Sequence, residues 1–280
     1  MTWNKKCWGI FSNIYWTTRF IGMRSIKVAR ELADPNVVVP KSGRVYVRYG
    51  TEGDVVKKLL SQEEVLNHFF NIAFDIASDD VISQLPCRPL GIEDRGPFES
   101  YSRGFHHTRF GWSENEDVTQ PDGFFFSPRS LIGVELKLGS STWPEQILKY
   151  LALMVCEERK TGKRGNLGLL FIVPEKVREN HLSKIGINRP SLDAEFIARL
   201  SKLPKRIKRL FEENPIELDS VRRRVRLGSV SWTWLRDQLK HIESELDPRI
   251  RGEQTLLRLL AGLRAQIQDH KGTGIPVGEP

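Results

Sequence analysis

PDGFFFSPRSLIGVELKL, residues 121–138, is the stretch that decides the fold of this chain. Two short apolar runs, residues 123–126 and 131–134, flank a Ser-Pro-Arg-Ser segment, and this pattern is typical of a β-hairpin. A turn centred between Pro128 and Arg129 places Asp122 opposite Glu135. The register is an assumption at this point, because a slip of one residue would turn every side chain to the other face.

Three charged side chains share one face of this predicted hairpin. Side chains alternate along a strand, so Glu135 and Lys137 point to the same side and Asp122 faces them. The run at residues 134–138 is otherwise apolar, and charges in a buried run are costly without partners. An Asp in a Pro-Asp-Gly turn and a solvated, charge-paired strand face are the plain alternatives.

The pairing of two carboxylates predicts a cation site. Two carboxylates at close range repel unless a hard divalent ion neutralises them, so magnesium is the expected cofactor, with manganese as a substitute. Such an ion polarises a phosphoryl oxygen and lowers the pKa of a bound water, while a nearby lysine orients that water or offsets developing charge. Phosphodiester hydrolysis requires these parts.

Further elements are expected on both sides of the hairpin. Pro144 suits the first turn of a helix on which Gln146 and Tyr150, four residues apart, share a face. Residues 167–173 form a continuous apolar run typical of a buried central strand. Residues 62–77 predict a helix before the hairpin. Its expected buried side consists of Val65, Leu66, Phe69, Phe70, Ile72, Ala73 and Ile76.

With Pro121-Asp122 and Glu135-Leu136-Lys137 as its two motif elements, the chain resembles the PD-(D/E)xK nuclease superfamily over residues 52–174. The Gln-x-x-x-Tyr spacing of Gln146 and Tyr150 is similar to that of RecB-like members. The resemblance implies an α/β fold with a mixed central sheet flanked by helices, a restriction-endonuclease-like core, here followed by a helical C-terminal extension.

The resemblance also implies roles for the motif residues. Asp122 and Glu135 would hold the metal together with the backbone carbonyl of Leu136. Lys137 would position or activate water, and Gln146 and Tyr150 would support the site. Some members carry an extra acidic ligand near the first helix. The candidates are Glu52, Glu63 and Glu64, although acids at a helix start are expected from the helix dipole alone.

Composition divides the 280 residues into four parts: an aromatic, basic arm (1–50), the nuclease-like core (51–175), a basic and mostly helical region (176–270) and a flexible tail (271–280). The first 156 residues carry equal numbers of basic and acidic side chains, so the formal excess of +8 lies after them. Its densest parts are residues 202–209 and 222–226. Either a solvated basic surface or a phosphate-binding surface fits them.

The C-terminal region predicts a strand or turn at residues 221–227 and then a helical hairpin. Two apolar stripes recur at helical spacing, and each is more often intramolecular core than a dimer seam. A homodimer or a protein partner bound through these helices stays open. The stripes are Leu235, Leu239, Ile242 and Leu246, then Leu256, Leu260, Leu263 and Ile267.

Several classes of protein are disfavoured. Three widely separated cysteines indicate neither a disulfide framework nor a zinc ribbon, and a reducing cytoplasm is the expected location. No stretch is long and apolar enough to suggest a membrane span, and no signal peptide is indicated. His106 and His107 are adjacent, so on a strand they point to opposite faces and make a poor metal pair.

The sequence therefore predicts a magnesium-dependent DNA nuclease, with endonuclease favoured over exonuclease, in phage defence, restriction or DNA repair. RNA as the substrate stays open. One alternative is a nucleic-acid-binding or assembly protein on the same fold without turnover, since fold does not establish activity. Another is a structural partner protein that uses the aromatic arm and the helical stripes.

Overall fold

A computed structural model describes residues 63–100, 121–139, 144–184, 187, 192 and 205–276, together with three short strands before residue 48. The chain divides into two units, Met1–Gln62 and Glu63–Pro280. In the first unit, β1 (Gly22–Ser25), β3 (Arg44–Val47) and β2 (Val37–Val38) form an antiparallel sheet in the order β1-β3-β2. The aromatic residues Trp3, Trp8 and Trp16 and the pair His106 and His107 lie outside the described residues.

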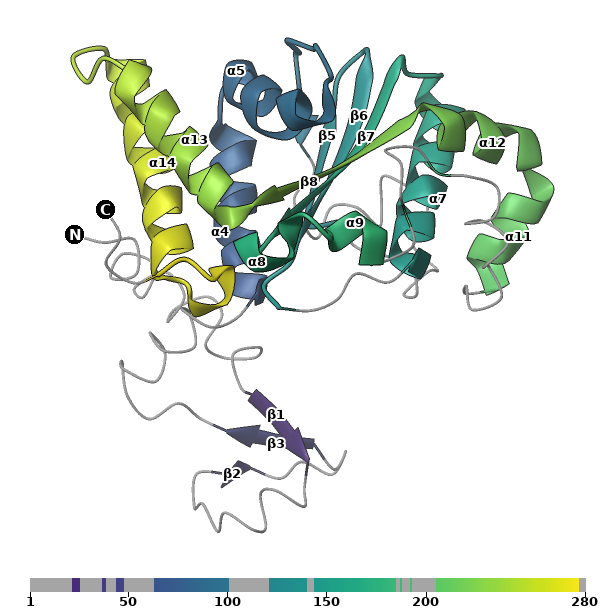
Figure 1. The fold of residues 1–280 in the computed structure, drawn as a ribbon, viewed down its shortest axis with the longest axis horizontal. Coiled ribbons are helices and arrows are strands. Elements are labelled where there is room, and N and C mark those ends of the chain that lie inside the picture. The colour runs from purple at the N-terminus through teal and green to yellow at the C-terminus, as the bar shows by residue number, and fades with distance from the viewer. Residues whose placement is uncertain are drawn as a thin grey trace. The chain divides into compact units, whose positions relative to one another are not determined.

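A five-stranded mixed sheet in the order β4-β5-β6-β7-β8 forms the centre of the second unit (Figure 1). β4 (Glu99–Ser100), β5 (Gly123–Phe126) and β6 (Ser130–Leu136) pair antiparallel. β7 (Asn166–Val173) and β8 (Val225–Ser231) continue the sheet parallel to β6. The α/β class and the mixed central sheet predicted from the sequence are confirmed.

The predicted hairpin register is also confirmed. Gly123 pairs with Val134 and Phe126 with Leu131, which is the register of a turn centred between Pro128 and Arg129. The turn closes locally, because the Ser127 hydroxyl accepts hydrogen bonds from the backbone N–H groups of Arg129 and Ser130. Both faces of β5 and β6 are buried, so the turn chemistry, rather than an alternation of apolar and polar residues, selects this register.

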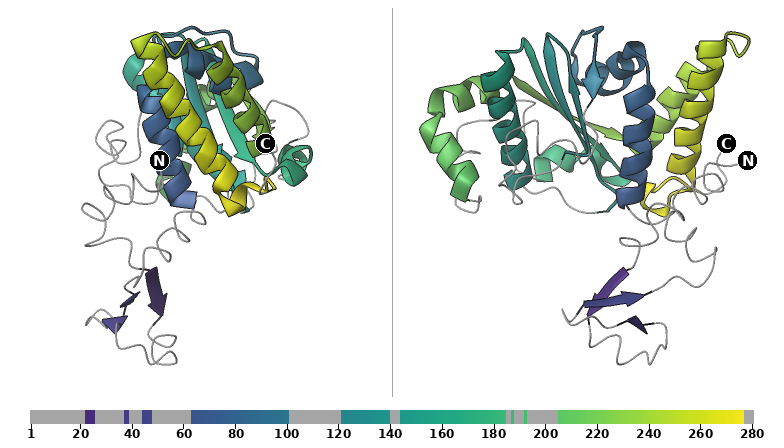
Figure 2. Two further views of the ribbon diagram at one scale, coloured as in Figure 1. Left: turned by 90° about the vertical axis from the view of Figure 1, so that its left-hand side faces the viewer. Right: turned by 180° about the vertical axis from the view of Figure 1, so that it is seen from behind.

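Helices cover both faces of the sheet (Figures 1 and 2). On one face, α7 (Pro144–Thr161) connects β6 to β7, and α11 (Lys205–Glu213) and α12 (Pro215–Arg224) pack against it. The other face carries α4 (Glu63–Ile76) and the turn of α5 (Asp79–Ile82), η1 (Ser83–Cys87) and η2 (Arg88–Leu90). Short helices α8 (Glu175–Arg178) and α9 (His181–Lys184) follow β7.

The predicted helical hairpin is confirmed in α13 (Trp232–Glu245) and α14 (Arg251–Asp269), which pack on each other, and α14 also packs on α4. Its central apolar side chains, among them Leu239, Leu260 and Leu263, are fully buried within this one chain. The stripes are therefore intramolecular core. In the part of the chain that the structure describes, no helix has both the length and the hydropathy needed to cross a bilayer.

Three sequence predictions need correction. On α4, Ile72 and Ile76 are exposed and Phe74 is buried instead, because the apolar residues almost encircle the helix and only tertiary packing selects the buried side. The predicted strand or turn at residues 221–227 is confirmed as strand only from Val225, where β8 begins; residues 221–224 are the end of α12. Part of the predicted flexible tail is packed: η4 (Lys271–Thr273) is helical, and Thr273 and Ile275 are buried.

Candidate active site

The predicted site residues meet at one end of the strands of the sheet. The parallel strands β6, β7 and β8 have their carboxyl ends there, and the antiparallel strand β5 begins there. Asp122 therefore lies directly before β5, and Glu135 and Lys137 lie at the end of β6. The carboxyl ends of parallel strands are a common place for binding sites in α/β proteins. Asp122, Glu135 and Lys137 are 6%, 3% and 7% exposed, so the charged groups are buried together.

Asp122 is held by donors from two elements. Its Oδ2 accepts a hydrogen bond from the backbone N–H of Leu136 at 2.9 Å, which ties the carboxylate across the hairpin. Its Oδ1 accepts from the Nδ2 of Asn67 on α4 at 2.5 Å. Asn67 is itself 2% exposed, and its Oδ1 has no hydrogen-bond partner within the described segments. Helix α4 thus fixes the carboxylate of Asp122, which directly precedes β5.

Glu135 is the centre of the hydrogen-bond network. Lys137 donates from Nζ to Oε1 of Glu135 at 2.6 Å, and Gln146 donates to the same oxygen. Tyr150 donates its hydroxyl to Oε2. The predicted shared face of Gln146 and Tyr150 on the helix is confirmed, since both reach one carboxylate from α7. Three donors, one of them cationic, offset the cost of burying this charge.

Tyr150 reaches the site because Gly133 leaves room for it. A Cβ at Gly133 would lie 3.0 Å from the Tyr150 ring and 3.2 Å from Leu169. The ring therefore packs closely against the strand at Gly133, and its hydroxyl lies 3.3 Å from the carbonyl of Val134. The pKa of Tyr150 is raised well above its ordinary value, first by burial and then by the charges of Glu135 and Asp122. Tyr150 thus stays protonated and acts as a donor.

Lys137 is fixed through its backbone on both sides. Its N–H donates to the carbonyl of Ile172 on β7 at 2.8 Å. Its carbonyl accepts from Nε1 of Trp232, the first residue of α13, also at 2.8 Å. Trp232 is fully buried, and Ser231 caps its helix by accepting from the backbone N–H of Trp234. The end of β8 therefore anchors the residue that carries the candidate catalytic amine.

His181 lies close to this site on α9. It is buried, and its ring lies 5.1 Å from that of Phe171 in a tilted arrangement; Phe171 pairs with Glu135 in the sheet. Its pKa is lowered to about 4, first by burial and then by the positive charges of Lys137 and Lys184. The imidazole is therefore neutral at pH 7, and it adds no charge beside Lys137.

The donor set can be tested against the predicted magnesium. In the described part of the chain, no group of three His, Cys, Asp or Glu side chains could hold a metal ion. Magnesium does not require one, because it binds through one or two carboxylates and keeps several waters and substrate oxygens. Asp122 and Glu135 supply two buried carboxylates, and the unpartnered Oδ1 of Asn67 is a further hard oxygen beside Asp122. The residues present fit magnesium.

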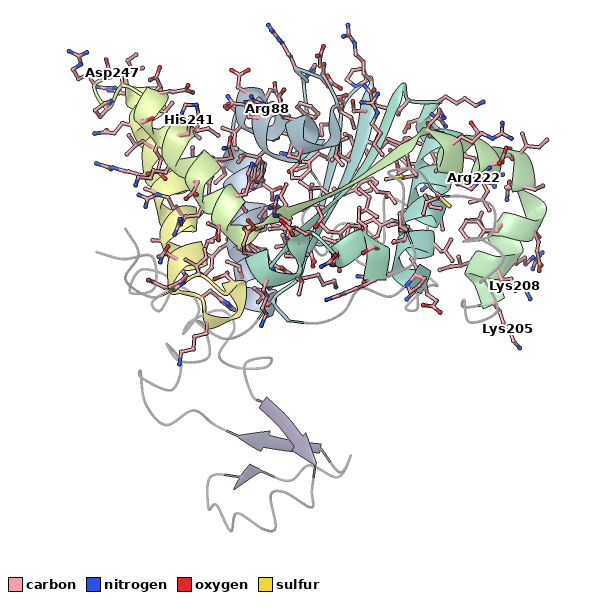
Figure 3. The ribbon with its side chains drawn as sticks, in the orientation of Figure 1. Arg88, Lys205, Lys208, Arg222, His241 and Asp247 are labelled. Carbon is pink, nitrogen blue, oxygen red and sulfur yellow. The ribbon has the colours of Figure 1, made fainter. Side chains whose placement is uncertain are left out.

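The two basic clusters differ in their environment. Among the arginines after residue 221, Arg222 bonds Asp219 and the carbonyl of Leu192, and Arg224 bonds both carboxylate oxygens of Glu158. These two side chains stabilise the fold, whereas Arg223 and Arg226 of the same cluster are exposed, and phosphate binding by this cluster stays a prediction. On α11, Lys205 and Lys208 are exposed and point outward (Figure 3).

Sequence reasoning missed four residues that build the site: Asn67, Gly133, His181 and Trp232. Their contacts to the motif residues come from other elements, up to 95 positions away along the chain. Asn67 lies on the buried stripe of α4, and a buried asparagine on an apolar helix face was the one available signal. Comparisons of the chain with protein-family models, curated proteins and solved structures give no match.

Proposed function

We propose that this chain is a metal-dependent nuclease of the PD-(D/E)xK type with a restriction-endonuclease-like core. One observation carries the proposal: Asp122, Glu135 and Lys137 are buried together at the edge where β6 ends, with a lysine amine 2.6 Å from a carboxylate. The order α4, β5, β6, α7, β7 supports it, because the resembling family implies this order. DNA is the proposed substrate and magnesium the proposed cofactor.

In this proposal Asp122 and Glu135 hold the metal with the carbonyl of Leu136, and Asn67 keeps Asp122 oriented. When bound, magnesium polarises the phosphoryl oxygen and acidifies a water. Lys137 orients the attacking water and offsets the charge that builds on the phosphate. Gln146 and Tyr150 hold Glu135 in place by donating to both of its oxygens. Because these donors sit on strands and helices, the site is preorganised.

One observation favours a second candidate function, a nucleic-acid-binding protein without turnover. Glu135 already receives three donors from its own chain, so the network is internally satisfied as it stands. A carboxylate has about four acceptor positions, so three donors do not exhaust it. The two candidates differ in whether Glu135 exchanges the Lys137 amine for a cation when substrate arrives.

The test is cleavage by the purified protein of supercoiled plasmid, end-labelled linear single- and double-stranded DNA, and RNA, with magnesium, manganese or chelator. The variants Asp122→Asn and Lys137→Met should lose metal-dependent cleavage by more than about a hundredfold. Asp80→Asn and Lys240→Met, on exposed helix positions, are matched controls that should cleave like the parent. No cleavage of any substrate by the parent, or equal cleavage by Lys137→Met, would overturn the proposal.

A further inference from the structure

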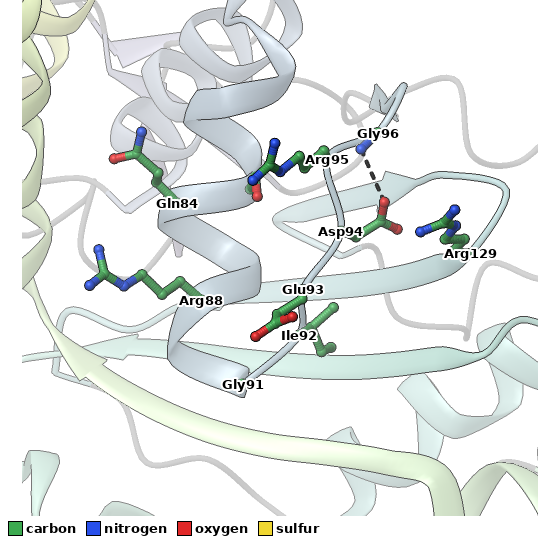
Figure 4. A pocket seen from close by; sticks show the side chains of 10 residues that line it. Gln84, Arg88, Gly91, Ile92, Glu93, Asp94, Arg95, Gly96 and Arg129 are labelled. Carbon is green, nitrogen blue, oxygen red and sulfur yellow. Dashed lines mark hydrogen bonds between the residues drawn. The ribbon is translucent and has the colours of Figure 1, made fainter.

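A polar cavity lies at the other end of the sheet from the candidate active site, where the β5–β6 hairpin turns. Its volume is about 860 Å³, and it opens between the hairpin turn and the segment that runs from η1 through η2 to Gly96 (Figure 4). The cavity is separate from the candidate active site. Arg129 precedes β6 and Lys137 follows it, so seven residues of extended strand, roughly 25 Å, separate the two.

Three arginines from three segments line this cavity: Arg88 from η2, Arg95 from the loop after it and Arg129 from the hairpin turn (Figure 4). All three are exposed. Within the segments that the structure describes, none of their guanidinium groups makes an ion pair or hydrogen bond with the protein. Arg222 and Arg224 differ in this respect, because their guanidinium groups donate hydrogen bonds to carboxylates of the same chain.

The two acids of the lining do not neutralise these arginines. Asp94 is 2% exposed, and it accepts from the hydroxyls of Ser127 and Ser130 and from the backbone N–H of Gly96. It is a structural carboxylate that fixes the turn carrying Arg129 to the loop carrying Arg95. Glu93 is exposed. The lining holds three arginines against two acids, so its formal charge is positive, and Asp94, being buried, presents little of its negative charge to a ligand in the cavity.

We propose that this cavity binds phosphate groups of a nucleic-acid strand, as a second contact away from the site of cleavage. This inference rests on the proposed function, because it extends the substrate of the candidate active site. A guanidinium matches two phosphate oxygens with two parallel hydrogen bonds, and contacts of this kind position a nucleic acid without reading its sequence. A cavity of this size can accept a phosphate with its attached sugar.

The geometry predicts a minimum substrate length. Each strand of a duplex advances about 3.4 Å per base pair, so about 25 Å corresponds to roughly seven base pairs. A strand that reaches both sites must extend at least this far from the scissile bond. The cavity therefore supplies affinity and placement, and Asp122, Glu135 and Lys137 supply the chemistry.

The test measures binding in chelator, where cleavage is absent. The affinity of a labelled duplex of about 30 base pairs is followed by fluorescence anisotropy from roughly 50 to 200 mM salt. Arg88→Gln, Arg95→Gln and Arg129→Gln together should weaken binding by on the order of tenfold to a hundredfold and lower the salt slope by about 2.7, at 0.9 for each lost phosphate contact. The triple Arg→Lys variant keeps the charge and should bind with intermediate affinity.

The matched control removes three exposed basic side chains elsewhere, Lys240→Gln, Arg251→Gln and Arg258→Gln on α13 and α14. An equal loss of duplex affinity in this control would mean that net charge alone determines binding, and it would overturn the inference. Unchanged affinity of the cavity variant would overturn it as well. If a mononucleotide protects the arginines from modification while duplex binding is unchanged, the cavity takes a free nucleotide and the inference fails. If the parent binds duplex through the cavity but cleaves no substrate, the proposal for the cavity stands and the proposed nuclease activity is refuted.

Discussion

Asn67 on α4 donates a hydrogen bond of 2.5 Å to Asp122, so a helix that contributes none of the motif residues orients the first of the two carboxylates. The amide is buried, and only one of its two ends is satisfied in the described structure. A buried polar group with an unsatisfied atom costs free energy. Its retention is explained if the free oxygen serves a cation at the site.

Asn67→Asp replaces this donor by an acceptor of the same shape. Two buried carboxylates would then face each other, so the free energy of unfolding should fall by about 1–3 kcal/mol at pH 7. Lower pH should restore part of the lost stability, because one carboxylate is then protonated. Magnesium should also restore stability if the site binds the ion. Denaturant unfolding with and without magnesium measures this, and the exposed Asn180→Asp is the control. A magnesium effect equal in the two variants would argue against a cation beside Asp122.

Gly133→Ala should displace Tyr150 from Glu135. The new Cβ would lie 3.0 Å from the ring, and overpacking of this kind costs about 1–3 kcal/mol. If the variant stays folded under the assay conditions and yet cleaves more slowly than the parent, the Tyr150 hydroxyl contributes to the candidate site. Gly252→Ala, on α14 with no atom within 4 Å of the added Cβ, should leave stability unchanged or raise it by up to about 1 kcal/mol. Thermal melting of both variants makes the comparison.

Arg224→Met should destabilise the fold because it leaves Glu158 buried with one cationic partner fewer. Of its hydrogen bonds within the described residues, Glu158 would keep only the one from the backbone N–H of Arg164, and the free energy of unfolding should fall by about 2 kcal/mol. The neighbouring Arg223→Met is the control, since that side chain is 70% exposed and should cost less than about 0.5 kcal/mol. Equal losses in urea unfolding would mean that the Glu158 pair is not the cause.

Cys87 should resist alkylation in the folded protein. Burial, and then the charge of Asp94, raise the pKa of its thiol to about 12, so almost no thiolate is present at pH 8. The thiolate is the form that reacts. Mass spectrometry after iodoacetamide treatment should find Cys87 modified only when the chain is unfolded first. Modification of the native protein at the rate of a free thiol would show that this region opens.

His181 should make the fold sensitive to acid. Its pKa is about 4 in the folded chain and about 6.5 when unfolded, so the unfolded state binds the proton more readily. Its contribution to stability is complete above pH 6.5 and is lost as the pH falls from 6.5 towards 4. His181→Phe keeps a ring on Phe171 and should flatten this dependence. The exposed His241→Gln should not change it.

The parts of the fold that the sequence predicted are those with a local cause. The hairpin register follows from two apolar runs closed by a serine turn, and the start of α7 follows from Pro144. The boundary between α12 and β8 could not be predicted, because it falls inside an arginine run whose side chains are held by distant partners. Glu158 is 66 positions away from Arg224. The burial of Phe74 in place of Ile72 depends likewise on packing between elements.

The candidate site divides in the same way. Spacing alone brought Asp122, Glu135 and Lys137 to one face and placed Gln146 and Tyr150 together. The residues that hold them, Asn67 and Trp232, become visible only when α4 and α13 are packed beside the sheet. The arginine cavity also joins three separate segments, and each arginine alone looks like an ordinary surface residue.

The hydrogen bond from Trp232 to the carbonyl of Lys137 makes the C-terminal helices part of the support of the candidate site. A shortened chain that ends at Ser231 would keep every motif residue and the whole sheet. It would lose the hydrogen bond from Trp232 and so expose the backbone carbonyl of Lys137. A graft of residues 121–150 onto another scaffold would lose the same support. The smallest fragment that keeps the candidate site supported therefore extends to the indole at the start of α13, well beyond the motif itself.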